Sequence, residues 1–165
     1  MEINKYSEMA RKTAIYPNLG DNYTYPLLGL IEESAEVDEK IMLGINKEEI
    51  IKELGDVYWY LSSCSDELNL KLEDILNNPK ESNLSLSLEG SKIAGYLKKI
   101  MRDDNGILNE DKKIKIIDSL KKIAFLMNKY ERDYQVSQKI IMEKNIEKLY
   151  SRKERGTLKG SGDNR

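Results

Sequence analysis

"GLIEESAEV" (residues 29–37) and "KELGDVYWYL" (residues 52–61) decide how this chain folds, because each sets carboxylates beside apolar side chains. Residues three or four positions apart lie on the same side of an α-helix. Glu33 therefore projects together with Glu36, and Glu53 together with Asp56. We predict two amphipathic helices here, each with an acidic edge next to an apolar one.

Helical spacing of apolar residues continues on both sides of these stretches. Gly44 is a natural stop between the two acidic helices, and "YPNLGDNYTYP" at 16–26 is predicted to be a loop. No segment alternates convincingly with a period of two, so we predict an all-α protein, a helical bundle. The predicted helices cover residues 3–13, 27–43, 47–68, a short turn after 70, 86–102, 110–130 and 133–151.

The composition argues against several classes of partner and location. The chain has 165 residues, 34% of them charged, with a net charge of −2, so no basic surface indicates a nucleic-acid partner. The start "MEINKYSEMARK" lacks the apolar core of a signal peptide, and no 18-residue apolar run predicts a membrane span. The single Cys64 lies in a periodic apolar stretch and is predicted to be buried. We expect one domain, soluble and cytoplasmic.

The acidic residues are the strongest candidates for chemistry. Histidine is absent, which excludes a histidine base, a Ser-His triad and an imidazole metal site. A short connection at Gly44 would make the acidic helices antiparallel, so that their carboxylates face each other. Burying unpaired carboxylates costs several kcal/mol each, and a hard divalent cation removes that cost. All-oxygen ligands suit Mg²⁺ or Mn²⁺ better than Zn²⁺. On spacing alone, a solvated acidic face stays the alternative.

These motifs resemble the signature of the MazG-like, all-α nucleoside triphosphate pyrophosphohydrolase superfamily, E-E-x-x-E followed by E-x-x-D. Here the first motif is Glu32-Glu33-Ser34-Ala35-Glu36 and the second is Glu53-Leu54-Gly55-Asp56. The resemblance extends to "TAIYP" before the first acidic helix, "DELNLKLEDIL" after the second, and "NIEKLYSRKERGTLKGSGDNR" at the end. It leaves residues 78–135 unaccounted for.

The resemblance implies a bundle of that type and hydrolysis of a nucleoside triphosphate to the monophosphate and pyrophosphate. It implies a Mg²⁺ cofactor, with Mn²⁺ possible, whose ligands fall on Glu33, Glu36, Glu53 and Asp56. Without histidine, the proton of the attacking water goes to a carboxylate or to solvent, and Glu32 and Glu36 are both candidates for this catalytic role. A non-catalytic nucleotide-binding or helical interaction module is the alternative function.

The C-terminal part supplies the candidate substrate-binding residues, which are Asn145, Lys148, Arg152, Arg155 and Arg165. Lysine and arginine can hold phosphate oxygens, and the asparagine amide can bind a base or sugar. The Gly-rich tail offers backbone N–H groups to an anion. A frayed terminus is the alternative for this tail.

Two groups of aromatic residues have open roles. Tyr58, Trp59 and Tyr60 lie on a core helix, where packing is the more common role than stacking on a base. Tyr16, Tyr23 and Tyr25 precede the acidic helix, where they are candidates for contact with a nucleoside.

Residues 86–127 resemble a degenerate copy of the acidic helix pair. Aligning Leu54 with Leu120 places Ser119 and Lys122 where the first copy has Glu53 and Asp56. In one register Glu89 and Lys92 stand opposite Glu33 and Glu36, and in the other Lys92 and Gly95 do. An unrelated helical insertion is the alternative.

The chain is therefore divided into an active repeat at 27–77, a degenerate repeat plus final helix at 84–151, and a Gly-rich tail at 152–165. We predict that the two helix pairs pack with pseudo-twofold symmetry, and that one metal cluster per chain is built from residues 32–56. Further self-association into a homo-oligomer is left open by the sequence.

Overall fold

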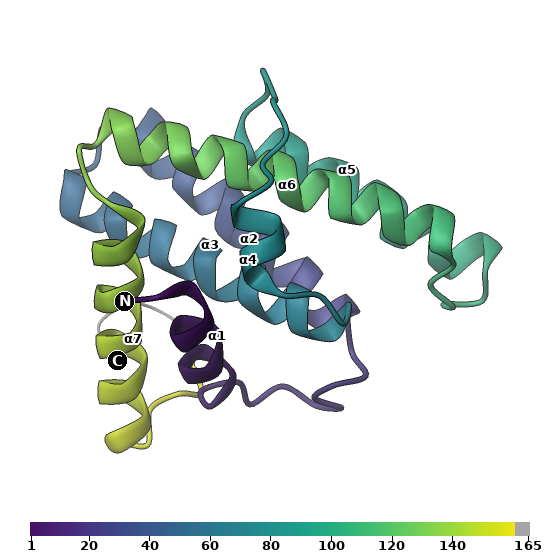
Figure 1. Ribbon diagram of the computed structural model, residues 1–165, viewed down its shortest axis with the longest axis horizontal. Helices are drawn as coiled ribbons and strands as arrows, with labels where there is room; N and C mark the ends of the chain where they lie inside the picture. The colour runs from purple at the N-terminus through teal and green to yellow at the C-terminus, as the bar shows by residue number, and fades with distance from the viewer. Residues whose placement is uncertain (161–165) are drawn as a thin grey trace.

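The computed structural model describes residues 1–160, and within them it contains seven α-helices and no strand (Figure 1). The predicted all-α fold class is confirmed. The helices are α1 (Ile3–Arg11), α2 (Thr24–Met42), α3 (Lys47–Glu67), α4 (Leu72–Leu76), α5 (Leu86–Asp103), α6 (Glu110–Asp133) and α7 (Gln138–Glu154).

The start of α2 differs from the prediction. The helix begins at Thr24, so Pro26 lies inside its first turn and not in the preceding loop. Proline is tolerated there because the first N–H groups of a helix have no intrahelical partner. The side chain of Asn22 also accepts a hydrogen bond from the backbone N–H of Tyr25 at 3.1 Å, which stabilises this early start.

The junction between α6 and α7 also lies later than predicted. The turn is formed around Gln135, whose φ of 49° is in the left-handed region. Glutamine is not a usual residue for that conformation, so the sequence does not mark the stop. Ser137 then caps α7 by accepting a hydrogen bond from the N–H of Ile140.

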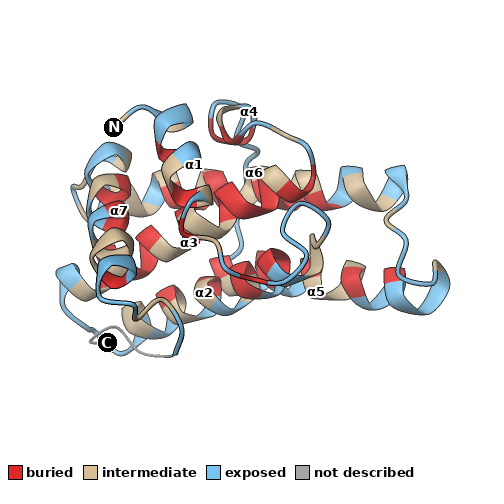
Figure 2. Cartoon of the chain, turned by 90° about the horizontal axis from the view of Figure 1, so that it is seen from below, coloured by how far each residue is buried: buried red, intermediate tan, exposed pale blue. Residues whose placement is uncertain are grey.

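The helices pack around α2 and α3. Helix α2 contacts both α3 and α5, α5 contacts α6, and α1 and α7 both contact α3. Figure 1 shows α5 and α6 side by side, extending as a hairpin beyond the other helices. Buried residues line the inward faces of the helices (Figure 2), and Cys64 is fully buried among them. Within residues 1–160 no helix combines the length and apolar character that a membrane span requires.

The second helix pair, α5 and α6, supplies part of the core. Leu97, Leu120 and Met127 are buried, as the apolar spacing predicts. Glu89 is only 1% exposed, and its carboxylate accepts hydrogen bonds from Ser82 Oγ at 2.6 Å and Lys92 Nζ at 3.2 Å. The ammonium group of Lys92 therefore offsets the charge of this acid. The internal repeat itself stays a prediction.

Candidate functional site

The acidic edges of α2 and α3 meet in one cluster. The connection between these helices is short, and Asn46 caps α3 by accepting a hydrogen bond from the N–H of Glu49 at 3.1 Å. Because the chain reverses there, the two acidic motifs face each other. One carboxylate oxygen from each of Glu33, Glu53 and Asp56 lies within 4.8 Å of the other two. Glu53 is 3% exposed, so the cluster extends into the protein.

Two lysines offset part of this charge. Lys40, on α2, forms an ion pair with Glu53, and Lys148, on α7, lies with its Nζ 2.5 Å from Asp56 Oδ2. Glu33 is the third carboxylate of the cluster, and Glu36 lies beside it on α2.

The pKa values of the α2 acids reflect this crowding. Burial raises the pKa of Glu33 to about 9, and the charges of Asp56 and Glu36 contribute to the shift. Burial and the nearby Glu53 also raise the pKa of Glu36. A cation between these groups would remove the repulsion. The donors are all oxygens, partly buried and close together, and this set fits a hard divalent cation such as Mg²⁺ or Mn²⁺.

Asn145 lies beside the cluster and is 3% exposed. Its Nδ2 donates to Asp56 Oδ1 at 2.9 Å, and its Oδ1 accepts from the hydroxyl of Tyr6 at 2.9 Å. Gly55 permits this contact, because a Cβ at that position would lie 2.9 Å from the Cβ of Asn145. The amide that we assigned to a base or sugar from the sequence is thus engaged with a carboxylate of the cluster.

A cleft of about 630 Å³ opens beside the carboxylates. Its acidic wall is formed by Glu32, Glu33, Glu36, Glu53 and Asp56. Its aromatic wall is formed by Tyr16, Tyr25, Trp59 and Tyr60, with Thr13, Ile15 and Pro17 beside them. The C-terminal part of the chain closes the third side with Leu149, Arg152, Leu158, Lys159 and Gly160.

The aromatic wall is a packed set of rings. The rings of Tyr16 and Tyr25 stack with centroids 4.7 Å apart, and Trp59 meets Tyr16 edge-on at 6.5 Å and Tyr60 edge-on at 4.8 Å. Gly29 makes room for this wall, since a Cβ there would lie 2.0 Å from Cε1 of Tyr60.

The remaining two aromatic candidates lie elsewhere. Tyr23 donates its hydroxyl to the carbonyl of Gly106 at 2.8 Å, next to the α5–α6 turn. Tyr58 is fully buried and donates to the carboxylate of Glu131. Both therefore serve packing between helices, which the sequence alone did not separate from a role in stacking.

The other predicted site residues are spread over the cleft and the end of α7. Glu32 is exposed on the rim of the cleft, whereas Arg152 is 4% exposed and lines its wall. Arg155 is exposed at the C-terminal end of α7, where it donates to Ser151 Oγ. Arg165 lies outside the described residues.

Sequence reasoning missed three residues that shape this site. Lys40 could have been found, because it follows Glu36 by one helical turn and shares its face. Tyr6 had no comparable signal, since it reaches the site from a segment far away in the sequence, whereas Lys159 lies in the Gly-rich tail that the sequence already made a candidate for binding an anion.

Comparisons with known proteins agree with this geometry. Residues 23–81 match the family model described as "MazG nucleotide pyrophosphohydrolase domain", a range that contains α2, α3, α4 and all of the clustered carboxylates. The chain is also similar to the Gene 37 protein of Mycobacterium phage L5, with 32% identity over 77 residues, which are 47% of this chain and 68% of that protein. No solved structure matches the chain.

Proposed function

We propose, from the premise that this chain belongs to the MazG nucleotide pyrophosphohydrolase family, that it hydrolyses a nucleoside triphosphate to the monophosphate and pyrophosphate with the help of Mg²⁺ or Mn²⁺. The observation that carries the proposal is that one cleft combines a carboxylate cluster with a wall of aromatic rings. These two features suit the two ends of such a substrate.

The metal ligands in this proposal are Glu33, Glu53 and Asp56, with Glu36 beside them. A bound divalent cation supplies neutralisation of charge on the phosphate oxygens. Lys40 and Lys148 form ion pairs with Glu53 and Asp56 at the edge of this set. The phosphate chain of the substrate therefore lies along the acidic wall.

The nucleoside lies against the aromatic wall. Trp59 and Tyr25, which are not fully buried, offer ring faces on which a base can stack, and stacking contributes about 1–3 kcal/mol per base. Arg152 and Lys159 line the third side of the cleft, where their cationic groups can hold phosphate oxygens. This assignment brings cationic side chains and carboxylates together around one phosphate chain.

In the proposed reaction a water molecule attacks the α-phosphorus. The bond between that phosphorus and the oxygen bridging to the β-phosphate breaks, and pyrophosphate leaves with the bridging oxygen. We assign the proton of the water to Glu36, because it lines the cleft beside the proposed metal ligands and is less exposed than Glu32. Glu32 is more exposed and is the residue to compare with it.

The first experiment measures pyrophosphate and orthophosphate release from a panel of ribo-, deoxy- and damaged nucleoside triphosphates with Mg²⁺ and with Mn²⁺. We expect pyrophosphate from the wild type, and a loss of at least about 100-fold in Glu53→Gln and Asp56→Asn. Glu48→Gln is the matched control, because Glu48 is an exposed acid on the same helix. Glu36→Gln should lower kcat more than Glu32→Gln.

Each other outcome has a definite meaning. Release of orthophosphate in place of pyrophosphate would show that water attacks the γ-phosphorus and not the α-phosphorus. No release of either product over the whole panel contradicts the enzymatic proposal. Nucleotide binding in a calorimetric titration without turnover would then favour the non-catalytic module.

We further propose one catalytic site per chain. The second helix pair has Ser119 and Lys122 at the aligned positions, and Lys122 forms an ion pair with Asp118 at 2.7 Å. An ammonium group repels a divalent cation. Glu89→Gln is therefore expected to keep the wild-type kcat, and a loss comparable to that of Glu53→Gln would contradict a single site.

A further inference from the structure

The cleft's aromatic wall is built partly from helices and partly from the segment between α1 and α2, residues 12–23. This segment contributes Thr13, Ile15, Tyr16 and Pro17 to the cleft. The segment has no regular secondary structure, so its shape depends on side-chain and backbone contacts with the rest of the fold.

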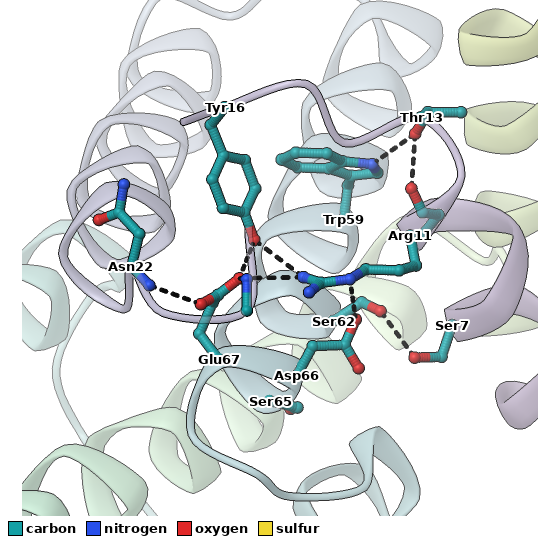
Figure 3. Close-up of polar contacts among 12 residues, drawn as sticks. Ser7, Arg11, Thr13, Tyr16, Asn22, Trp59, Ser62, Ser65, Asp66 and Glu67 are labelled. Atoms are coloured by element: carbon teal, nitrogen blue, oxygen red, sulfur yellow. Dashed lines mark hydrogen bonds and ion pairs between the residues drawn. The ribbon is translucent and has the colours of Figure 1, made fainter. Parts of the chain in front are cut away.

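One carboxylate accepts three hydrogen bonds from this segment. Glu67, which Figure 3 shows with its partners, is the last residue of α3. Its side chain is 0% exposed. Its Oε1 accepts from the Tyr16 hydroxyl at 2.8 Å, the Gly20 N–H at 2.8 Å and Arg11 Nη1 at 3.0 Å. Its Oε2 accepts from the Asn22 N–H at 2.7 Å. Glu67 thus fixes the middle and the end of the segment at once.

The backbone of the segment is shaped to fit this carboxylate. Gly20 has a φ of 97°, a conformation that other residues rarely adopt, and it lets the chain turn so that two N–H groups point at Glu67. Burial opposes the charge of the carboxyl group, but the N–H groups of Asn22 and Gly20 outweigh it and hold the pKa of Glu67 below the ordinary value.

Tyr16 connects this anchor to the cleft. Its hydroxyl is on Glu67, while its ring stacks on Tyr25 and meets Trp59 edge-on. Thr13 adds a second link, because its Oγ1 accepts from Trp59 Nε1 at 2.9 Å (Figure 3). Movement of the segment away from Glu67 would therefore separate the rings of the wall.

We infer that Glu67 is a positioning residue for the nucleoside end of the substrate: its carboxylate holds residues 12–23 in the shape that completes the aromatic wall. The inference rests on the proposed function. Glu67 touches neither the substrate nor the carboxylate cluster, and it acts through Tyr16 and the backbone of the segment.

The test uses Glu67→Gln, Tyr16→Phe and the control Glu48→Gln. Glutamine keeps the shape of Glu67 but loses its charge and one acceptor oxygen, and phenylalanine removes only the hydroxyl that Glu67 accepts. Trp59 is the single tryptophan of the chain, so its fluorescence reports on the wall without any ligand. We expect acrylamide to quench Trp59 more strongly in Glu67→Gln, with an intermediate effect in Tyr16→Phe and none in the control.

Binding measurements then separate the two ends of the cleft. The probes are a nucleoside triphosphate with a non-hydrolysable α,β-imido link, inorganic tripolyphosphate, and Mn²⁺ followed by electron paramagnetic resonance. Glu67→Gln should weaken the nucleotide about tenfold, the loss expected when part of the base-stacking surface is removed. It should leave the affinities for tripolyphosphate and Mn²⁺ unchanged.

Several results would overturn the inference. Equal weakening of nucleotide and tripolyphosphate would mean that Glu67 acts through the whole fold, and unchanged nucleotide affinity would mean that it does not act on this site. If circular dichroism shows that Glu67→Gln does not fold, the test passes to Tyr16→Phe, which removes the hydrogen bond between Tyr16 and Glu67. Wild-type nucleotide affinity in Tyr16→Phe would contradict the inference.

Failure of the proposed function is distinguishable from failure of this inference. A wild type that binds no nucleotide would refute the proposed function and, with it, the role of Glu67 toward substrate. Even without nucleotide binding, increased Trp59 quenching in Glu67→Gln would show that Glu67 holds residues 12–23 in place. Unchanged quenching would refute this structural role of Glu67 too.

Discussion

Asn145 donates its side-chain amide to Asp56 across 2.9 Å, and this contact ties the last helix to a carboxylate 89 residues earlier in the chain. The same amide accepts from Tyr6. Groups that orient a metal ligand in this way typically change metal affinity 10- to 100-fold when removed. The geometry therefore predicts that Asn145 acts on Asp56 and through it on the cation.

Asn145→Ala should weaken Mn²⁺ binding about 10- to 100-fold, measured by electron paramagnetic resonance titration without substrate. Tyr6→Phe should weaken it less, because the direct bond to Asp56 stays. Asn78→Ala is the control, since Asn78 is an exposed amide that bonds the carbonyl of Asp74. Wild-type Mn²⁺ affinity in Asn145→Ala would show that Asp56 is oriented without it.

Lys40 and a divalent cation should compete for Glu53. Lys40→Met keeps the length of the side chain but leaves Glu53, which is 3% exposed, without this ion pair. We expect the variant to lose about 1–3 kcal/mol of stability in EDTA and to gain more stability than the wild type when Mn²⁺ is added. Thermal melts with and without Mn²⁺ measure both effects. Lys47→Met is the control on the exposed start of α3, and an equal Mn²⁺ shift in both variants would refute the competition.

Gly29→Ala should disturb the aromatic wall. The added Cβ would lie 2.0 Å from Tyr60 Cε1, so the ring or the α2–α3 contact must shift. Overpacking of this kind costs about 1–3 kcal/mol in urea unfolding. Gly95→Ala is the matched control, because a Cβ on that α5 glycine meets nothing within 4 Å and should add about 0.5–1 kcal/mol through helix propensity. Equal stability of the two variants would contradict the close contact.

Glu67 should make the free energy of unfolding depend on pH in the acidic range. Its pKa is lowered in the folded chain, so its contribution is present above the unfolded value of about 4.3 and is lost as the pH falls through the folded pKa. The difference in unfolding free energy between wild type and Glu67→Gln should therefore be largest near neutral pH and shrink on acidification below about pH 4. Urea unfolding at a series of pH values measures it, and a difference that does not vary with pH would exclude the charge as the cause.

The C-terminal segment should matter for substrate and not for the fold. Leu158, Lys159 and Gly160 line the cleft, while the helices end at Glu154. Deleting residues 156–165 should leave the circular dichroism spectrum unchanged and raise KM. Deleting 161–165 alone tests the predicted role of Arg165. Wild-type KM and kcat in the longer deletion would argue against any role of the segment in binding.

The helices and the pairing of acids were predictable because both depend on local spacing. A period near 3.6 assigns Glu33 to the same face as Glu36, and Glu53 to that of Asp56, whatever surrounds them. Errors arose where a local rule has exceptions. Pro26 was expected to lie outside α2 but fits its first turn. Gln135 forms a turn in the left-handed region, which glutamine rarely adopts, so its residue type does not predict the end of the helix.

The sequence by itself determined an all-α chain with two acidic helices and a family signature, since these follow from residue types at fixed short distances along the chain. Only the tertiary structure decided which partner each polar group meets. Asn145 reaches Asp56, and Glu67 collects the hydrogen bonds of residues 12–23, because helix packing brings together segments that no local pattern connects. A buried polar group needs a hydrogen-bond partner, and in this chain packing against α3 supplies those partners from segments distant in the sequence.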